Sequence, residues 1–277
     1  MESGLAGKRA LVTGGTTGIG LAIAVALAGE GVDVCVASRS ARPAAVEELR
    51  GYGVHSEWIQ ADVSTVEGVT RMVKEARTAL GGLDLFVNNA AGTWHEPITR
   101  LTEDAWSRTV ATNLTACAFA CREVGRIFIS QRHGSILIIG STAAHTPLYR
   151  ESSYRVSKAG LKSLMEVVAI ELAPYSIRVN LLTPGAFITE LTRNLPARQM
   201  GGAMVPLRRP GKVEELGAAA VLLLSDTLSS YTTGSELVVD GGLHLRPLDL
   251  YTDEELLALN EAGVADRADH PGASSPI

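Results

Sequence analysis

Short apolar runs alternate with amphipathic segments along most of the chain. A short apolar run bounded by turn residues is typical of a strand buried on both faces, whereas apolar positions spaced three and four apart indicate a helix. The runs expected to form strands are Arg9–Thr13, Val32–Ser38, Leu83–Asn88, Ser135–Ile139, Arg178–Leu182 and Glu236–Val239, with a further one at His55–Gln60. The helical segments lie between them, at roughly 18–30, 41–51, 64–80, 102–131, 152–173 and 211–225.

This alternation predicts an α/β fold, namely a doubly wound, parallel, seven-stranded sheet with helices on both faces, which is the Rossmann architecture. Residues 1–243 are expected to form a single dinucleotide-binding and catalytic domain, and residues 244–277 a C-terminal extension. Thr252 and Glu255 have the spacing of a capping box before a short helix. The end of the extension, from Asp266 to Ile277, is rich in Pro, Ser and Gly, and we expect it to be mobile.

Composition narrows the class of protein. The 277 residues are 46% hydrophobic and 20% charged, so a sizeable core is available. The net charge is −5 and no long basic run occurs, which argues against nucleic acid as a partner. The three cysteines lack the spacing of metal ligands, so we expect no metal and a reduced, cytoplasmic protein. No secretory signal is visible, and the longest apolar run is too short to span a bilayer, so no membrane partner is expected.

A glycine-rich stretch joins the first expected strand to the first expected helix, and reads Thr13-Gly14-Gly15-Thr16-Thr17-Gly18-Ile19-Gly20. Gly14 allows a tight turn, Gly18 lets the backbone approach a pyrophosphate, and Gly20 permits close packing of helix and sheet. The N-terminus of the helix offers N–H groups to the phosphates. The spacing differs from the common G-x-G-x-x-G fingerprint, and the alternative is an ordinary glycine-rich loop. With a strand before it and a helix after it, we favour a dinucleotide site.

The end of the second strand bears on which dinucleotide binds. It reads Ser38-Arg39-Ser40, without the acidic residue that would bind a ribose 2′-hydroxyl. Arg39 offers a planar set of donors to a 2′-phosphate, so we expect NADP(H), with NAD(H) less favoured. Arg39 could instead be a solvated charge or stack on the adenine. Thr17 stands where a second basic residue would strengthen the preference.

Polar and small residues also follow the third and fourth strands. Asp62 and Val63 are placed to contact the adenine, although Asp62 could simply cap a helix. The fourth strand ends in Asn-Asn-Ala-Ala-Gly at 88–92. Small residues at the carboxyl end of a strand leave room for a flat ring, and asparagine side chains can tie adjacent loops together.

A serine, a tyrosine and a lysine form the candidate catalytic group. Ser141 follows the fifth strand, and Tyr154 and Lys158 lie one turn apart on one face of the next helix. A free phenol has a pKa near 10, and a fixed ammonium beside it favours the phenolate. Tyr154 could then pass a proton to a substrate oxygen that Ser141 holds. A Tyr–Lys pair on a solvated helix face is the alternative.

In these motifs and their order the chain resembles the short-chain dehydrogenase/reductase family, in its single-domain branch, over roughly residues 5–243. The motifs are the glycine stretch at 13–20, residues 88–92, Asn113, Ser141, Tyr154-x-x-x-Lys158, Asn180 and Pro184-Gly185. The resemblance implies a catalytic tetrad of Asn113, Ser141, Tyr154 and Lys158. It also implies that Asn113 positions a water bridging to Lys158 in a proton relay. Where the family has Asn-Asn-Ala-Gly this chain has one more alanine, which could reshape the floor of the substrate site.

The resemblance places Lys158 on the nicotinamide ribose, Pro184-Gly185 behind the nicotinamide and Thr189 on its carboxamide. The full set of expected cofactor contacts is Gly14, Thr16, Thr17, Gly18, Ile19, Gly20, Ser38, Arg39, Ser40, Asp62, Val63, Asn89, Ala90, Ala91, Tyr154, Lys158, Pro184, Gly185, Ile188 and Thr189. In family terms residues 185–212 are the substrate lid, and Trp94, His95, His145, Leu148 and Tyr149 also line the substrate site.

These features predict an NADP(H)-dependent oxidoreductase, a ketoreductase, that transfers hydride between the nicotinamide and a ketone or secondary alcohol. The lid is rich in apolar residues, so a fairly apolar small molecule is expected: a cyclic ketone, a steroid, a polyketide or a ketoacyl compound. The alternative is that these apolar residues only pack a short pair of helices together. The alternatives are an NAD-linked catabolic alcohol dehydrogenase and a non-catalytic dinucleotide-binding regulator. The resemblance also implies a homo-oligomer, a tetramer or a dimer, built on the helices at 102–131 and 152–173.

Overall fold

A computed structural model describes residues 2–94, 96–146, 150–189 and 205–245 of the chain. Contacts divide the chain into two units, Met1–His244 and Leu245–Ile277.

The first unit is built on one seven-stranded sheet in which every pairing is parallel. The strands are β1 (Arg9–Thr13), β2 (Asp33–Ser38), β3 (Ser56–Gln60), β4 (Leu85–Asn88), β5 (Gly134–Ile139), β6 (Ile177–Pro184) and β7 (Glu236–Val239). Their order across the sheet, β3-β2-β1-β4-β5-β6-β7, reverses direction between β1 and β4. A doubly wound sheet binds ligands at such a reversal, outside the carboxyl ends of its strands. The predicted fold class is confirmed.

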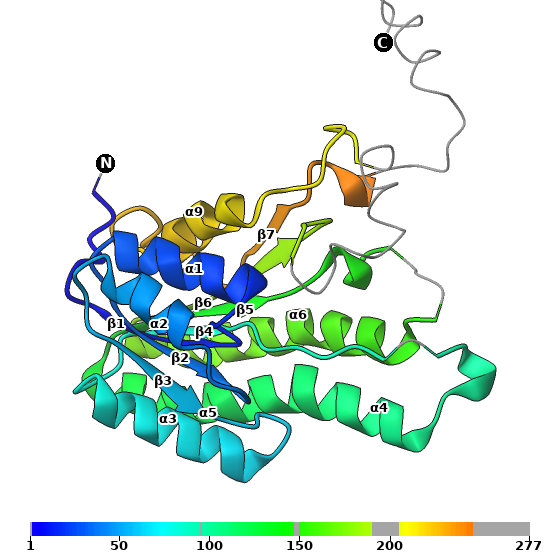
Figure 1. Cartoon of the computed structure of the whole chain (residues 1–277), viewed down its shortest axis with the longest axis horizontal. Helices are drawn as coiled ribbons and strands as arrows, with labels where there is room; N and C mark the ends of the chain where they lie inside the picture. Colours follow the sequence, from blue (N-terminus) through cyan, green and yellow to red (C-terminus); the bar gives the residue numbers. More distant parts are fainter. Residues whose placement is uncertain (1, 95, 147–149, 190–204, 246–277) are drawn as a thin grey trace, which may run out of the picture. The chain divides into compact units, whose positions relative to one another are not determined.

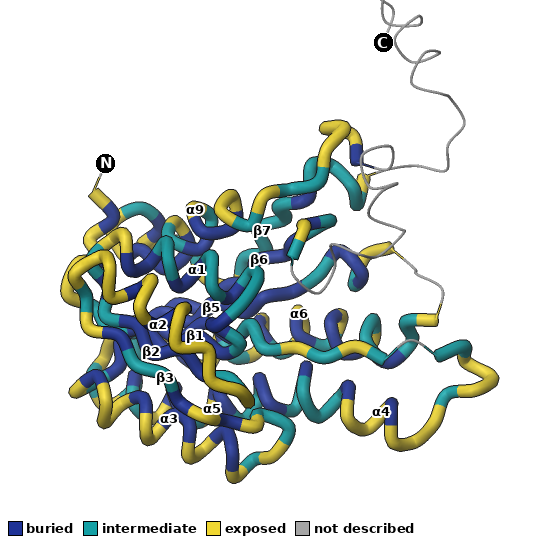
Figure 2. The backbone as a smooth tube through the Cα atoms, in the orientation of Figure 1, coloured by how far each residue is buried: buried dark blue, intermediate teal, exposed yellow. Residues whose placement is uncertain are grey.

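Helices cover both faces of the sheet (Figure 1). They are α1 (Gly18–Gly29), α2 (Pro43–Arg50), α3 (Val66–Ala79), α4 (Glu103–Val110), α5 (Ala116–Gln131), α6 (Ser152–Leu172) and α9 (Val213–Leu224). Because side chains alternate along a strand, Leu11 enters the core on the α3, α5 and α6 side and Val12 the core on the α1 and α9 side. Figure 2 shows the central strands and the inward sides of the helices as buried, and the edge strand β7 as intermediate.

The segment expected as one helix at 102–131 is divided in the structure. A π-helical turn, Ala111–Thr115, separates α4 from α5. A π-helical turn contains one residue more than an α-helical turn, and this changes the directions of the side chains within it. Asn113 lies in this turn and is 1% exposed. Simple periodicity could not predict the turn, because the apolar face continues on both sides of it.

No helix in the described parts of the chain is long and apolar enough to cross a membrane. Within those same parts, no group of three His, Cys, Asp or Glu side chains is placed to hold a metal ion.

Candidate active site

The glycine stretch 13–20 forms a tight connection between β1 and α1. Gly14 has φ +64°, and a Cβ there would lie 2.9 Å from the Nδ2 atom of Asn89. A Cβ on Gly20 would overlap the carbonyl oxygen of Gly14, so the first turn of α1 packs directly on the loop. Side chains are therefore excluded at these positions by contacts inside the protein, as expected for a backbone cradle.

The N-terminus of α1 suits a phosphate. Its N-cap residue, Thr17, makes no side-chain capping bond, and the described first turn contains no acidic residue. The first N–H groups of a helix have no intrahelical acceptor, and the helix dipole adds positive potential there. These are the features of a helix N-terminus that binds phosphate.

The loops after β1 and β4 are tied together by Thr13 and Asn89. The Thr13 Oγ1 atom accepts hydrogen bonds from the backbone N–H groups of Asn89 (2.9 Å) and Ala90 (3.0 Å). The Asn89 side chain donates to the carbonyl of Thr13 at 2.9 Å. Sequence reasoning anticipated a tie by asparagine but missed Thr13, whose signal is a hydroxyl at the last position of the strand that enters the glycine stretch.

At the end of β2 the two serines beside Arg39 are not equivalent. Ser38 donates its hydroxyl to the carbonyl of Ser40 at 2.8 Å and accepts a bond from the indole of Trp58 at 2.9 Å. The Gln60 amide donates to the carbonyl of Arg39 at 3.1 Å, while Arg39 itself is exposed. The hydroxyl of Ser38 is thus already engaged within the protein, whereas the Arg39 side chain is exposed.

Asp62 lies between β3 and α3. Its carboxylate accepts from the Ser64 N–H at 2.9 Å, and the bonds from Ser64 lower the Asp62 pKa, with a smaller contribution from the charge of Arg39. The N-cap of α3 is Thr65, whose Oγ1 accepts from the Gly68 N–H at 3.1 Å. The alternative that Asp62 caps this helix is therefore wrong. Val63 beside it packs partly against the core.

Asn113 connects the β4 loop to α6. Its Oδ1 accepts from the Gly92 N–H at 2.8 Å, and its Nδ2 donates to the Gly92 carbonyl (2.9 Å) and to the Ser157 hydroxyl (3.0 Å). Ser157 in turn donates to the carbonyl of Tyr154 at 2.6 Å. Both N–H donors of the Asn113 amide are used, so this side chain fixes the loop after β4 against the helix that carries Tyr154.

Lys158 is, with Asn113, one of the two buried members of the expected tetrad. Its side chain is 4% exposed, and its Nζ donates to the carbonyl of Ile139, the last residue of β5, at 2.9 Å. Burial disfavours the ammonium and lowers the Lys158 pKa from 10.5 to about 8. The Nζ lies 5.8 Å from the centre of the Tyr154 ring, so the two side chains share one face of α6 as expected.

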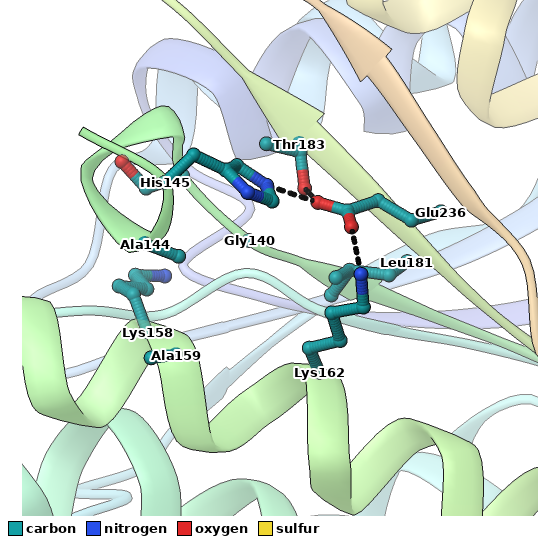
Figure 3. Close-up of a pocket in the computed structure, with 10 residues that line it drawn as sticks. Gly140, Ala144, His145, Lys158, Ala159, Lys162, Leu181, Thr183 and Glu236 are labelled. Atoms are coloured by element: carbon teal, nitrogen blue, oxygen red, sulfur yellow. Dashed lines mark hydrogen bonds and ion pairs between the residues drawn. The ribbon is translucent and has the colours of Figure 1, made fainter. Parts of the chain in front are cut away.

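Ser141 starts the connection from β5 to α6. Its Oγ accepts from the Ala143 N–H at 3.1 Å and caps a short 3₁₀ turn, Thr142–Ala144. Ser141 and Lys158 line one cavity of about 130 Å³, which Figure 3 shows above α6. The geometry therefore brings the hydroxyl of Ser141, just after β5, and the ammonium of Lys158, on α6, to one cavity, and Lys158 also lies near the Tyr154 ring.

The far end of that cavity holds a cluster that sequence reasoning missed. Glu236, on β7, accepts hydrogen bonds from Thr183 (2.7 Å) and pairs with Lys162 (3.1 Å) and with His145 (2.7 Å). His145 was expected to line the substrate site, whereas its ring Nε2 faces Glu236 (Figure 3). No local signal marks Glu236, because its partners come from segments far away in the sequence.

The segment after β6 completes the candidate site. A Cβ on Gly185 would overlap Asp240. A Cβ on Gly18 would lie 3.5 Å from the Cβ of Thr189, so Thr189 lies beside the glycine stretch. Ile188 is half exposed. The greater part of the expected lid, 190–204, lies outside the described residues, as do His95, Leu148 and Tyr149.

The remaining expected contacts follow the same edge of the sheet. Thr16 is buried, Ile19 packs partly on the core, and Ala91 is exposed at the end of the β4 loop. Pro184 ends β6 and is paired with Val239 of β7. All these positions are at the carboxyl ends of the strands, on either side of the reversal between β1 and β4.

Comparisons with known proteins give a consistent result. The family described as Enoyl-(Acyl carrier protein) reductase matches residues 14–244. The chain is 36% identical over 249 residues to the 3-oxoacyl-[acyl-carrier-protein] reductase FabG of Chlamydia pneumoniae, covering 88% of this chain and 99% of that protein.

Among solved structures, a short-chain type dehydrogenase/reductase from Mycobacterium marinum superposes with a TM-score of 0.83 at 34% identity, covering 87% of this chain and 97% of the other. An NAD⁺-bound xylitol dehydrogenase superposes with a TM-score of 0.80 at 30% identity, covering 86% of this chain and 100% of the other.

Proposed function

The chain belongs to the short-chain dehydrogenase/reductase family, and from its site we propose an NADP(H)-dependent oxidoreductase that interconverts a ketone and a secondary alcohol. The observation that carries the proposal is the buried Lys158 beside Tyr154, with Ser141 on the same cavity. A Tyr–Lys pair on a solvated face would leave the lysine exposed, and here it is 4% exposed. A non-catalytic regulator has no need for a buried ammonium at this place.

Each residue has a defined part in the proposed reaction. The cofactor, when bound, supplies or accepts a hydride at the substrate carbon. Tyr154 donates a proton to the substrate oxygen during reduction and takes one during oxidation. Lys158 stabilises the phenolate by its charge, and Ser141 donates a hydrogen bond to the same oxygen. Asn113 positions these groups by fixing the β4 loop to α6 through Gly92 and Ser157.

The preference for NADP(H) rests on Arg39. The end of β2 offers no carboxylate to a ribose 2′-hydroxyl, and the exposed Arg39 guanidinium is a suitable partner for a 2′-phosphate. The Ser38 hydroxyl is already engaged by Trp58 and Ser40. The fold itself takes either cofactor, as the NAD⁺ bound to the similar xylitol dehydrogenase illustrates. NAD(H) is therefore the alternative cofactor, and it would accompany oxidation of an alcohol.

The first experiment is equilibrium binding of NADPH and NADH, read by fluorescence transfer from the protein's tryptophans, to the wild type and to Arg39→Ala. Loss of charge-assisted hydrogen bonds to a 2′-phosphate is worth about 1.5–3 kcal/mol, so Kd for NADPH should rise roughly 10- to 150-fold. Kd for NADH should stay nearly unchanged. Arg77→Ala, which removes an exposed arginine of α3, is the matched control. Equal effects on both cofactors would contradict the role given to Arg39.

A turnover assay then distinguishes an oxidoreductase from a non-catalytic dinucleotide-binding regulator. The wild type is mixed with NADPH and a panel of cyclic ketones, steroid ketones and 3-ketoacyl thioesters, and oxidation of the cofactor is followed by absorbance. We expect reduction of apolar ketones. Binding of cofactor without turnover of any carbonyl compound, in either direction, would favour the regulator.

A further inference from the structure

The turn that follows β2 carries Arg39 and is closed by a hydrogen bond of its own. Ser38 donates its hydroxyl to the carbonyl of Ser40 at 2.8 Å, which ties the residue before Arg39 to the residue after it. Serine hydroxyls that bond to nearby main-chain groups stabilise turns in this way. Arg39 therefore projects from a short piece of backbone whose two ends are joined.

The neighbouring strand β3 holds this turn from the side. β3 is the edge strand next to β2, and the register sets Ser38 opposite Gln60 (Figure 1). Side chains two residues apart lie on the same face of a strand, so Trp58 and Gln60 share one face of β3. The Trp58 Nε1 donates to the Ser38 hydroxyl at 2.9 Å. The Gln60 amide donates to the carbonyl of Arg39 at 3.1 Å.

These bonds act on successive residues of the turn. A serine hydroxyl has one proton to donate, and at Ser38 it goes to Ser40, so the indole of Trp58 uses an acceptor position of the same oxygen. The main chain of Ser38 is held as well, because its carbonyl accepts from the Ala61 N–H at 3.0 Å. The backbone at Ser38 and Arg39 is thus fixed by β3, while the Arg39 side chain is exposed.

The two donors on β3 differ in how firmly they are held. The Trp58 ring is partly buried and packs against the core on the α1 and α9 side, whereas Gln60 is exposed. A tryptophan side chain has two torsions and loses little freedom when it is packed. Trp58 therefore gives the turn a rigid support. The Arg39 guanidinium lies near the end of the same strand, because its charge contributes to lowering the Asp62 pKa.

We propose that Trp58 and Gln60 are positioning residues for the Arg39 guanidinium, and that they set the selectivity for a ribose 2′-phosphate by ordering the Ser38–Ser40 turn before the cofactor binds. The inference rests on the proposed function. An arginine on an ordered turn loses less freedom when it binds a phosphate, so the phosphate binds more tightly. A 2′-hydroxyl forms no charge-assisted bond with the guanidinium, so the ordering favours the phosphate selectively.

The competing explanation is that these bonds only fasten the edge strand to the sheet. The ladder between β2 and β3 already pairs five positions of each strand, so the two side-chain bonds add to an existing connection. The two explanations differ in which ligands they affect. A loosened edge strand would weaken the binding of every adenine nucleotide to the same extent, whereas a displaced guanidinium would weaken only the binding of nucleotides with a 2′-phosphate.

The first measurement is titration calorimetry with adenosine 2′,5′-bisphosphate and with 5′-AMP, two probes that differ only in the 2′-phosphate. Trp58→Phe keeps an aromatic ring and removes the N–H donor, and Gln60→Met keeps the length of the side chain and removes the amide. We expect Kd for the bisphosphate to rise roughly 2- to 12-fold in each variant, as for the loss of one ordered side chain. Kd for 5′-AMP should stay unchanged.

Trp106→Phe, at a partly exposed tryptophan of α4, is the matched control and should leave both Kd values unchanged. Circular dichroism establishes that each variant is folded. Because Gln60 is exposed, Gln60→Met tests the proposal even where Trp58→Phe does not fold. Unchanged binding of the bisphosphate in the folded variants, or equal losses for the two probes, would overturn the positioning role.

The second measurement repeats Trp58→Phe in the Arg39→Ala variant. A residue that acts through Arg39 has no further effect once the guanidinium is gone, so the two substitutions should be non-additive for the bisphosphate. A loss of the same size in both backgrounds would show that Trp58 acts independently of Arg39 and would overturn the inference. Failure of the proposed cofactor preference would already be visible in the wild type, as equal affinity for the two probes, and the inference would fall with it.

Discussion

At the scale of single residues, Lys158 combines a role in the site with an energetic cost. The folded protein holds its pKa at about 8, whereas the unfolded chain has the ordinary value of 10.5. Between these two pH values the unfolded chain binds more protons, so the free energy of unfolding rises as pH rises from about 8 to 10.5. Below pH 8 the buried ammonium lowers the free energy of unfolding by its full amount, on the order of 3 kcal/mol.

Replacing Lys158 with methionine should therefore stabilise the protein without cofactor. Lys158→Met removes the buried charge and keeps most of the apolar stem, so Tm should rise at pH 7. The gain should shrink toward pH 10, where the wild-type lysine is neutral. Differential scanning calorimetry at both pH values measures this, with Lys74→Met, on an exposed position of α3, as the control. A gain of the same size at both pH values would show that packing, and not ionisation, is responsible.

At the scale of elements, α1 and α9 pack closely enough to exclude side chains between them. A Cβ on Gly217 of α9 would lie 2.7 Å from the Cβ of Ala26 and 3.2 Å from the carbonyl oxygen of Ala22, both on α1. This contact holds α1 and α9 side by side on one face of the sheet. It thereby fixes the helix whose N-terminus faces the glycine stretch.

Gly217→Ala should therefore lower the free energy of unfolding, although alanine is the better helix former. Overpacking costs typically about 1–3 kcal/mol and helix propensity returns about 1 kcal/mol, so a net loss of up to about 2 kcal/mol is expected. Gly29→Ala is the control on α1, because its nearest atom would be a Tyr52 ring carbon at 3.8 Å. Urea unfolding should show the control at least as stable as the wild type. A stabilised Gly217→Ala would mean that the two helices can move apart freely.

The strands could be predicted from the sequence alone, whereas two features of the site region could not. Every expected strand is present in order, because a parallel strand buried on both faces is a run of apolar residues that needs no partner to be recognised. The expected strand at Arg178–Leu182 extends to Ile177–Pro184, which is a boundary effect. The π-helical turn at Asn113 and the cluster around Glu236 could not be predicted, because both depend on contacts between distant segments. Glu236 is 53 residues from Thr183 and 91 from His145.

At the scale of the whole molecule, α6 exposes an apolar stripe. Val156, Val167 and Ile170 are 50%, 52% and 76% exposed, and their spacing places them on one side of the helix. Monomeric proteins seldom expose several large apolar side chains in a row, and such a stripe marks a surface for another protein. The opposite side of the same helix carries Tyr154 and Lys158. Association along this stripe would hold the helix that carries these two residues in place from outside.

We predict that this stripe is the self-association surface expected from the family resemblance. The double variant Val167→Glu and Ile170→Glu puts two like charges at the centre of the contact, and their desolvation would cost several kcal/mol in an interface. Sedimentation velocity should show the wild type as a dimer or tetramer and the variant as a smaller species, both with the same circular dichroism spectrum. Tyr52→Glu, at an apolar residue 52% exposed after α2, is the control and should leave the assembly intact. An unchanged sedimentation coefficient in the double variant would place the contact elsewhere, and a wild type that sediments as a monomer would leave the stripe free for a different partner.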